Sequence, residues 1–284
     1  MPINVDEALS APALESEITW TTTDVLFYHL SIGASADELQ FTFERELQAV
    51  PTFGLVAGAG PSVGIRKPPE MSLPGIDVDL RKVLHVGQSI TLDRPIPTEA
   101  RARTSQRVVN ILDKQKAAII ELEKVVEDDD GPMWTELSRI WVHGEGNFGG
   151  SAGSQESSAE PTEQLAAIAS QTSAEQAALY RLNGDYNPLH IDPRFAKQAG
   201  LAQPILHGLA TFGIAALGVI RNLCHGDPRR LTHIQADFSH PVVPGQGLHT
   251  SVSKTIAEDG LRFSTSICGT ENHALKNGIV RVTD

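Results

Sequence analysis

The chain has 284 residues, of which 40% are hydrophobic, enough to form the cores of two domains of ordinary size. It carries 35 acidic residues against 23 lysines and arginines, and this net charge of −12 argues against nucleic acid or an anionic membrane as a partner. Its two cysteines, Cys224 and Cys268, are too few for a disulfide framework and favour a reducing compartment.

The opening residues lack the basic and apolar regions of a signal peptide. The longest apolar stretch, Leu206–Leu223, is interrupted by three glycines and by Arg221, so it is not expected to span a membrane. These features predict a cytoplasmic protein with no membrane partner.

In the first half, an apolar helix is expected to begin near Thr52, followed by a proline-rich segment from Gly60 to Asp79. Four stretches with strand character follow: Ser89–Leu92, Ala100–Leu112, Lys116–Glu127 and Trp134–His143. Residues 149–162 are rich in glycine and serine, which is typical of a flexible linker. The linker divides the chain into predicted domains at residues 1–148 and 163–284.

The second half repeats this order. Ser173 and Gln176 form a capping-box pattern for a short helix ending near Leu182, and Asp192-Pro193 is a start signal for another. The apolar stretch Leu206–Leu223 is the long helix, and the expected strands are His233–Ser239, Gly247–Ile256, Arg262–Cys268 and Gly278–Val282. Successive strands joined by short turns predict an antiparallel sheet in an α+β protein.

Two collinear matches indicate an internal duplication. Thr52-Phe-Gly54 matches Thr211-Phe-Gly213 at an offset of 211 − 52 = 159, and the segment from Pro95 matches that from Pro241 at 241 − 95 = 146. The difference of 159 − 146 = 13 residues places an insertion in the first half, within its proline-rich segment.

The clearest candidate site lies in the second half, in Tyr180-Arg-Leu-Asn-Gly-Asp-Tyr-Asn-Pro-Leu-His190. Proline prevents a helix from running through this segment, so Asp185 and His190 are expected on a bend where a carboxylate and an imidazole converge. Gly208 then opens the long helix, whose free N–H groups suit a developing oxyanion. Alternatively, Asp185 only caps a turn. His207 precedes the helix, as a cap or as support for the reacting groups.

These residues resemble the R-specific, MaoC-like enoyl-CoA hydratases, whose signature is close to Tyr-x-Leu-Ser-Gly-Asp-x-Asn-Pro-Leu-His, with Asn183 here in the place of serine. The likeness continues through Pro204-Ile-Leu-His-Gly208 and Phe238-Ser-His-Pro-Val-Val-Pro-Gly245, and through motifs of the first half such as Pro51-Thr-Phe-Gly54. It implies a tandem (double) hot-dog fold, in which an antiparallel sheet wraps a long central helix in each half. It also implies reversible hydration of trans-2-enoyl-CoA to the (3R)-3-hydroxyacyl-CoA.

The resemblance also implies roles for individual residues. Asp185 and His190 would hold and deprotonate the water, and the Gly208 N–H would donate to the thioester oxygen. His85 and Lys114 match positions that contact CoA, with solvated surface residues as the alternative. Binding roles are further expected for Asn187, which is also expected to tie the bend together, and for Phe238, which could equally be core.

Asp24 and His29 repeat the five-residue spacing but lack the glycine and the Asn-Pro bend, so they are not expected to react. One active site per chain is expected, with the first half shaping the acyl pocket. The sequence shows no nucleotide-binding glycine pattern, no nucleophile elbow and no third metal ligand beside the acid–base pair, so neither a cofactor nor a metal is expected.

An acyl-CoA partner and a homodimer are expected, and two alternatives stay open: a hot-dog acyl-CoA thioesterase and a catalytically silent acyl-binding domain. The opening of the chain and Leu73–Asp77 are similar to actinobacterial hydratases of steroid side-chain breakdown. The acyl group, linear or steroidal, is left open by the sequence.

Overall fold

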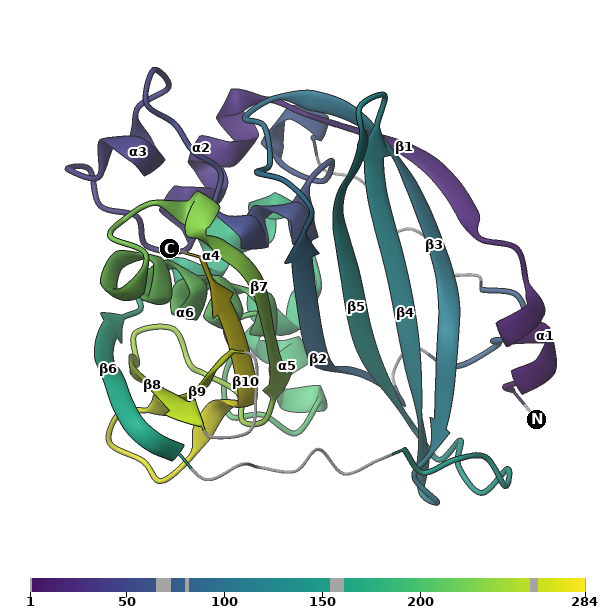
Figure 1. The fold of residues 1–284 in the computed structure, drawn as a ribbon. Coiled ribbons are helices and arrows are strands. Elements are labelled where there is room, and N and C mark those ends of the chain that lie inside the picture. Colours follow the sequence, from purple (N-terminus) through teal and green to yellow (C-terminus); the bar gives the residue numbers. More distant parts are fainter. Residues whose placement is uncertain (1, 65–72, 80–81, 154–160, 256–259, 284) are drawn as a thin grey trace.

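A computed structural model of the chain describes residues 2–64, 73–79, 82–153, 161–255 and 260–283. Within these residues ten strands form one sheet, in the order β1-β3-β4-β5-β2-β7-β10-β9-β8-β6, and neighbouring strands are antiparallel (Figure 1). The strands are β1 Leu14–Trp20, β2 Val83–Leu92, β3 Ala100–Asp113, β4 Ala117–Asp128, β5 Gly131–His143, β6 Pro161–Gln171, β7 Leu231–Phe238, β8 Gly247–Thr255, β9 Leu261–Ile267 and β10 His273–Val282. All eight predicted strands are confirmed, while β1 and β6 were not predicted.

The strand order confirms the internal repeat. Outward from the centre, the first half runs β2, β5, β4, β3, β1, and the second half runs β7, β10, β9, β8, β6. Both halves therefore place their second strand at the centre and their first strand at the edge. The halves meet where β2 pairs with β7, from Gly87 opposite Asp237 to Thr91 opposite His233.

The helices gather mainly beside the second half of the sheet (Figure 1). The α-helices are α1 Val5–Ser10, α2 Thr22–Ser31, α3 Leu39–Thr42, α4 Gln176–Tyr180, α5 Pro193–Gln198 and α6 Gly208–Leu223. Short 3-10 helices are η1 Pro51–Val56, η2 Pro61–Val63, η4 Arg181–Asn183, η5 Pro188–His190 and η6 Pro228–Arg230. In the described residues, no helix is long and apolar enough to cross a membrane.

Helix α6 is the central helix of the second half, and the strands β7, β10, β9, β8 and β6 curve around it (Figure 1). Its residues from Ala210 to Ile220 are all buried, as the absence of a polar face in its sequence requires. It begins at Gly208 and ends at Leu223, which confirms the helix that the sequence predicts there.

The first half lacks the long central helix that the sequence predicts from Thr52, so this part of the expectation is wrong for the described residues. The segment forms only the six-residue 3-10 helix η1, which packs against β2 and α6. Gly54 lies so close to Ile90 and Trp134 that a Cβ there would come within 2.8 to 3.0 Å of their side chains. The backbone at Gly58 is left-handed, with φ of +81°, so a right-handed helix cannot continue through it.

One apolar core runs through both halves. The ring of Tyr28 in α2 meets those of Phe53 and Tyr180 edge to face, at centroid distances of 5.8 and 6.2 Å. A smaller cluster lies between α1 and strands β3 and β4. A shared sheet and a shared core join the two halves, so the structure draws no boundary between them. The division into two domains stays a prediction. Residues 154–160 of the predicted linker lie outside the described residues, and Pro161 already begins β6.

Candidate active site

The segment after α4 forms the bend that the sequence predicts. Gly184 has a left-handed φ of +107°, and a Cβ there would approach Ala59 of the first half within 2.6 Å, so this position requires glycine. Asp185 Oδ1 then accepts a hydrogen bond from the backbone N–H of Asn187 at 3.1 Å. Asn187 Oδ1 in turn accepts one from the N–H of Leu189 at 3.0 Å, which caps η5. Asn187 therefore ties the bend together, as expected.

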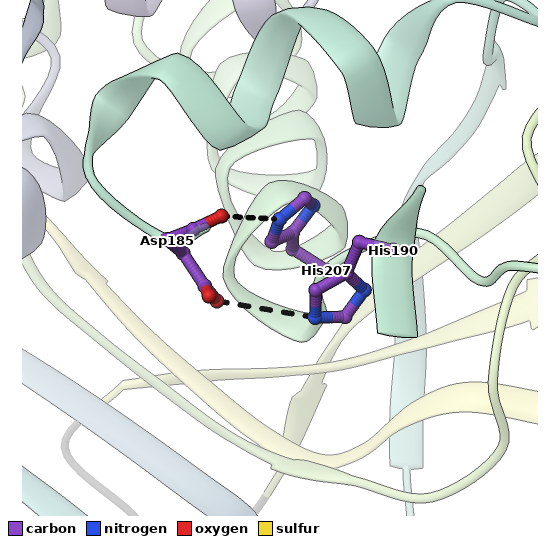
Figure 2. Close-up of side chains that lie close together, drawn as sticks. All are labelled: Asp185, His190 and His207. Carbon is purple, nitrogen blue, oxygen red and sulfur yellow. Dashed lines mark hydrogen bonds and ion pairs between the residues drawn. The ribbon is translucent and has the colours of Figure 1, made fainter. Parts of the chain in front are cut away.

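Asp185 and His190 face each other, with Asp185 Oδ2 3.9 Å from His190 Nε2 (Figure 2). His190 Nδ1 donates a hydrogen bond to the carbonyl oxygen of Ile205 at 2.8 Å, so the uncharged ring leaves Nε2 as a bare acceptor. The distance of 3.9 Å is too long for a direct hydrogen bond but suits a water that contacts both atoms. The side chain of His190 is 10% exposed and that of Asp185 is 50% exposed.

Burial lowers the pKa of His190 from its ordinary value, and the nearby Asp185 carboxylate opposes this effect. At neutral pH the imidazole is therefore uncharged and able to accept a proton. The carboxylate and the imidazole together form a pair of bases held around one small space.

His207 completes a cluster with this pair, and Figure 2 shows the three side chains together. Its ring stacks on that of His190, with centroids 3.7 Å apart and planes inclined by 26°. Its Nε2 donates to the backbone carbonyl of Asp185 at 3.2 Å. Burial is the largest cause that lowers the pKa of His207, to about 4. The sequence leaves its role open between a helix cap and a support. It precedes the first turn of α6 but makes no side-chain cap bond.

Gly208 begins α6 directly beside this cluster. The first N–H groups of a helix have no partner within the helix, and the helix dipole adds positive potential there. A Cβ on Gly208 would lie 3.4 Å from the ring of Phe238. The glycine, Phe238 and the histidine cluster line an open cavity of about 510 Å³, to which the first half contributes Val83, Leu84, His85 and Val86 of β2.

Both halves of the chain match known domains. Residues 18–141 match the MFE-2 hydratase 2 N-terminal domain, and residues 156–274 match the MaoC-like domain. Over 274 residues the chain is 38% identical to a Mycobacterium tuberculosis protein named enoyl-CoA hydratase ChsH3, covering 94% of this chain and 93% of the other. The chain belongs to the MaoC-like enoyl-CoA hydratase family.

Solved structures agree with this membership of the MaoC-like family. A MaoC-like dehydratase from Phytophthora capsici superimposes with a TM-score of 0.90 at 29% identity, covering 99% of both chains. A Mycobacterium tuberculosis protein described as having a double hotdog fold matches with a TM-score of 0.56 at 13% identity, over 96% of both chains. The predicted double hot-dog fold is thereby confirmed.

The CoA-contact residues suggested by the family resemblance fall in two places. His85 lines the cavity, where its ring meets Phe238 edge to face at 4.9 Å and its Nε2 donates to the Gly87 carbonyl at 3.0 Å. Burial lowers the pKa of His85 to about 4, so this ring is uncharged. Lys114 lies in the turn between β3 and β4, where its Nζ donates to the Ala152 carbonyl, and it does not line this cavity. Contact of either residue with CoA stays a prediction.

A third possible metal ligand, which the sequence spacing does not reveal, comes from the fold. Donor atoms of Asp185, His190 and His207 lie within 4.8 Å of one another. The Nε2 atom of His207 donates its hydrogen to the Asp185 carbonyl, and the Nδ1 atom of His190 donates to the Ile205 carbonyl, so neither of these nitrogens offers a lone pair to a metal. The arrangement therefore favours acid–base chemistry over a metal site.

Asp24 and His29, which are not expected to react, have structural roles. Asp24 is buried and accepts hydrogen bonds from the backbone N–H groups of Thr21 and Ser62 at 2.9 and 2.8 Å. His29 is buried, donates from Nδ1 to the Phe41 carbonyl at 2.9 Å and accepts at Nε2 from the Val50 N–H at 3.0 Å. Both side chains thus hold α2 to the segments that follow it, which include α3 and η2.

Proposed function

We propose that the chain adds water reversibly to trans-2-enoyl-CoA to give (3R)-3-hydroxyacyl-CoA. The observation that carries the proposal is the pair of acceptors, Asp185 Oδ2 and His190 Nε2, 3.9 Å apart beside the open N-terminus of α6. The named relative that is 38% identical, an enoyl-CoA hydratase, supports the same reaction. The (3R) configuration follows from the family resemblance.

A water held by these two acceptors donates one hydrogen to each of them. Its free lone pair is then directed away from both groups and can attack C3 of the enoyl thioester, while one of the two groups takes the proton. The π electrons of the C2–C3 bond move toward the thioester, and negative charge collects on its oxygen. The same proton is then delivered to C2, so one water supplies both the hydroxyl group on C3 and the hydrogen on C2. Because both groups lie on one side of the cavity, the addition is syn.

The N–H groups at the start of α6 are placed to stabilise this negative charge. The absence of a side chain at Gly208 lets the thioester approach the backbone, and a donor aimed at a developing oxyanion typically contributes about 10²- to 10³-fold in rate. The groups that the reaction requires all come from the chain, so the proposal includes no cofactor. The proposal includes a cytoplasmic location, because the two unpaired cysteines, Cys224 and Cys268, are typical of a reducing compartment. We also propose that the chain forms a homodimer.

For the acyl group we propose a bulky, steroid-like chain rather than a short one. The support is the resemblance of the chain's opening to steroid side-chain hydratases, together with the largely apolar walls of the cavity, formed by residues such as Leu189, Leu201, Leu206 and Leu275. The ratio of kcat/KM for a steroidal enoyl-CoA to that for crotonyl-CoA measures this preference. A ratio below one would contradict it.

The hydration itself is tested by removing either base. Asp185→Asn and His190→Gln should each lower kcat by about 10²- to 10⁴-fold while the fold survives, as loss of absorbance by the conjugated thioester would record. Asp227→Asn is the matched control, because Asp227 caps η6 and pairs with Arg229, and it does not line the cavity. Near-normal turnover in either folded variant would contradict the proposal. Release of free thiol by the unmodified chain would instead identify a thioesterase.

A further inference from the structure

His207 is the one member of the catalytic cluster that the proposed reaction does not use. It is 1% exposed, and it lies between the Asp185 bend, the ring of His190 and the start of α6. On another side Tyr180, which is also 1% exposed, tilts against it at a centroid distance of 5.0 Å. His207 therefore contacts both members of the acid–base pair and adjoins the start of α6.

The hydrogen bonding of His207 fixes its tautomer. Its Nε2 carries the hydrogen, because the partner, the backbone carbonyl of Asp185, can only accept. Its Nδ1 is buried and has no hydrogen-bond partner among the described residues. Burying a polar atom without a partner destabilises a fold. Phenylalanine would stack equally well without this penalty, so the presence of histidine is explained by the Nε2–H donor.

The ring of His207 has a second effect, because it covers one face of the His190 imidazole. The charged groups that act on His190 are the carboxylate of Asp185 and the guanidinium of Arg181, and their influences on its pKa oppose each other. Burial is the largest influence on that pKa, and the stacked ring supplies part of the burial.

We infer that His207 is a positioning residue, which ties the Asp185 carbonyl to the start of α6, the helix that supplies the oxyanion donor, and shields one face of the His190 ring from water. The inference rests on the proposed hydration and deepens it. Sequence adjacency joins His207 to Gly208, so a single side chain sets the spacing between the acid–base pair and the oxyanion donor. Removal of the hydrogen bond and removal of the ring are therefore expected to have different effects.

Two substitutions separate these effects. His207→Phe keeps the ring against His190 and Tyr180 but removes the donor to Asp185. It should lower kcat by about 10- to 100-fold, the usual effect of losing a residue that orients a reacting group, with KM changed less than about three-fold. His207→Gln keeps an N–H donor but removes the ring. Water then reaches His190, its pKa rises toward the ordinary value, and the acidic limb of kcat/KM moves to higher pH.

His249→Gln is the control, since His249 lies in β8 and does not line the cavity. The ¹⁵N shifts of His190, titrated in the unmodified chain and in His207→Gln, report its pKa without turnover. An unmodified chain that fails to hydrate enoyl-CoA would reject the proposed function, and the titration would still test the shielding by His207. An active chain whose His207→Phe variant keeps full kcat would overturn the inference. Equal kcat losses in both variants, with unmoved titrations, would overturn it as well.

Discussion

At the scale of single residues, Asp185 shows how one side chain serves two purposes. Its Oδ1 accepts the Asn187 N–H and stabilises the bend, while its Oδ2 faces His190. The two roles that the sequence allows for this residue, a turn cap and a reacting group, are thus compatible. The sequence locates the bend because glycine, asparagine and proline have strong local preferences.

The pH dependence of the proposed reaction follows from His190. Burial lowers its pKa below the ordinary value of 6.5, so the ring stays uncharged at neutral pH and takes up a proton only in more acidic solution. We expect kcat/KM to be level around neutral pH and to fall with a midpoint below 6.5. A profile of kcat/KM against pH on a small enoyl-CoA measures the midpoint. A midpoint above 6.5 would contradict the burial argument.

Two glycines of α6 should respond differently to alanine. In Gly208→Ala the atoms nearest to the new Cβ are those of the Phe238 ring, at an ordinary 3.4 Å, so the fold should survive. The methyl group would nonetheless stand where the thioester must approach, and kcat/KM should fall by about 10²-fold, as for other small misplacements of a substrate. Steady-state kinetics together with Tm decide this prediction.

Gly213→Ala is the matched comparison. There a Cβ would lie 2.7 Å from the Tyr28 hydroxyl and 2.9 Å from Ile32, inside the core. Overpacking of this kind costs about 1 to 3 kcal/mol of stability. Gly213→Ala should therefore lower Tm more than Gly208→Ala does. The reverse order would show that the start of α6 is less open than described.

At the scale of elements, local pattern predicts the β-branched strands and α6 well. It misses β1, a sheet edge on which most side chains are exposed, so that no buried face marks it in the sequence. It also misses β6, which is alanine-rich where it crosses α6 and begins inside the apparent linker. The sequence predicts a long helix where the structure has only the 3-10 helix η1. The close packing of Gly54 against neighbouring elements is a tertiary effect, which local pattern cannot predict. The stacking of His207 on His190, seventeen residues away, likewise depends on the tertiary fold.

The bend that carries Asp185 is braced by an element of the other half. Asn183 Nδ2 donates to Ser31 Oγ, at the end of α2, at 2.8 Å, and Gln176 Nε2 donates to the Ser31 carbonyl at 2.5 Å. Ser31→Ala should lower kcat roughly five-fold, since a buried hydrogen bond contributes about 1 kcal/mol. The double variant with Asn183→Ala should lose little more than either single variant. Additive losses in kcat would show that the two side chains act independently.

At the scale of the whole molecule, buried uncharged histidines make stability depend on pH. The pKa of His29 is about 4 in the folded chain, against an ordinary value of 6.5. The unfolded chain binds the proton first as pH falls, so the stabilisation is complete above 6.5 and is lost toward pH 4. His85 and His207, with pKa values also lowered to about 4, act in the same direction.

We therefore expect Tm to fall between pH 7 and pH 4.5, with each such histidine contributing about 1.4 kcal/mol per pH unit inside its window. Calorimetry at several pH values measures the slope. His29→Gln should be less stable at neutral pH but should show a shallower slope. An unchanged slope would mean that other groups dominate the acid response.

The pairing of β2 with β7 has a consequence for how the chain can be divided. Backbone hydrogen bonds from Gly87 to Thr91, the Thr91–His233 side-chain bond of 2.7 Å and the Arg139–Asp237 ion pair all join the halves without the segment that links them in sequence. Residues 1–153 and 161–284, produced as separate polypeptides, should therefore reassemble into one active particle. The second fragment alone contains Asp185, His190 and Gly208 but lacks both Ser31 and the strand that completes its sheet. The covalent link between the halves only keeps each half at a high effective concentration near the other. Two separate fragments at sufficient concentration can therefore pair without it.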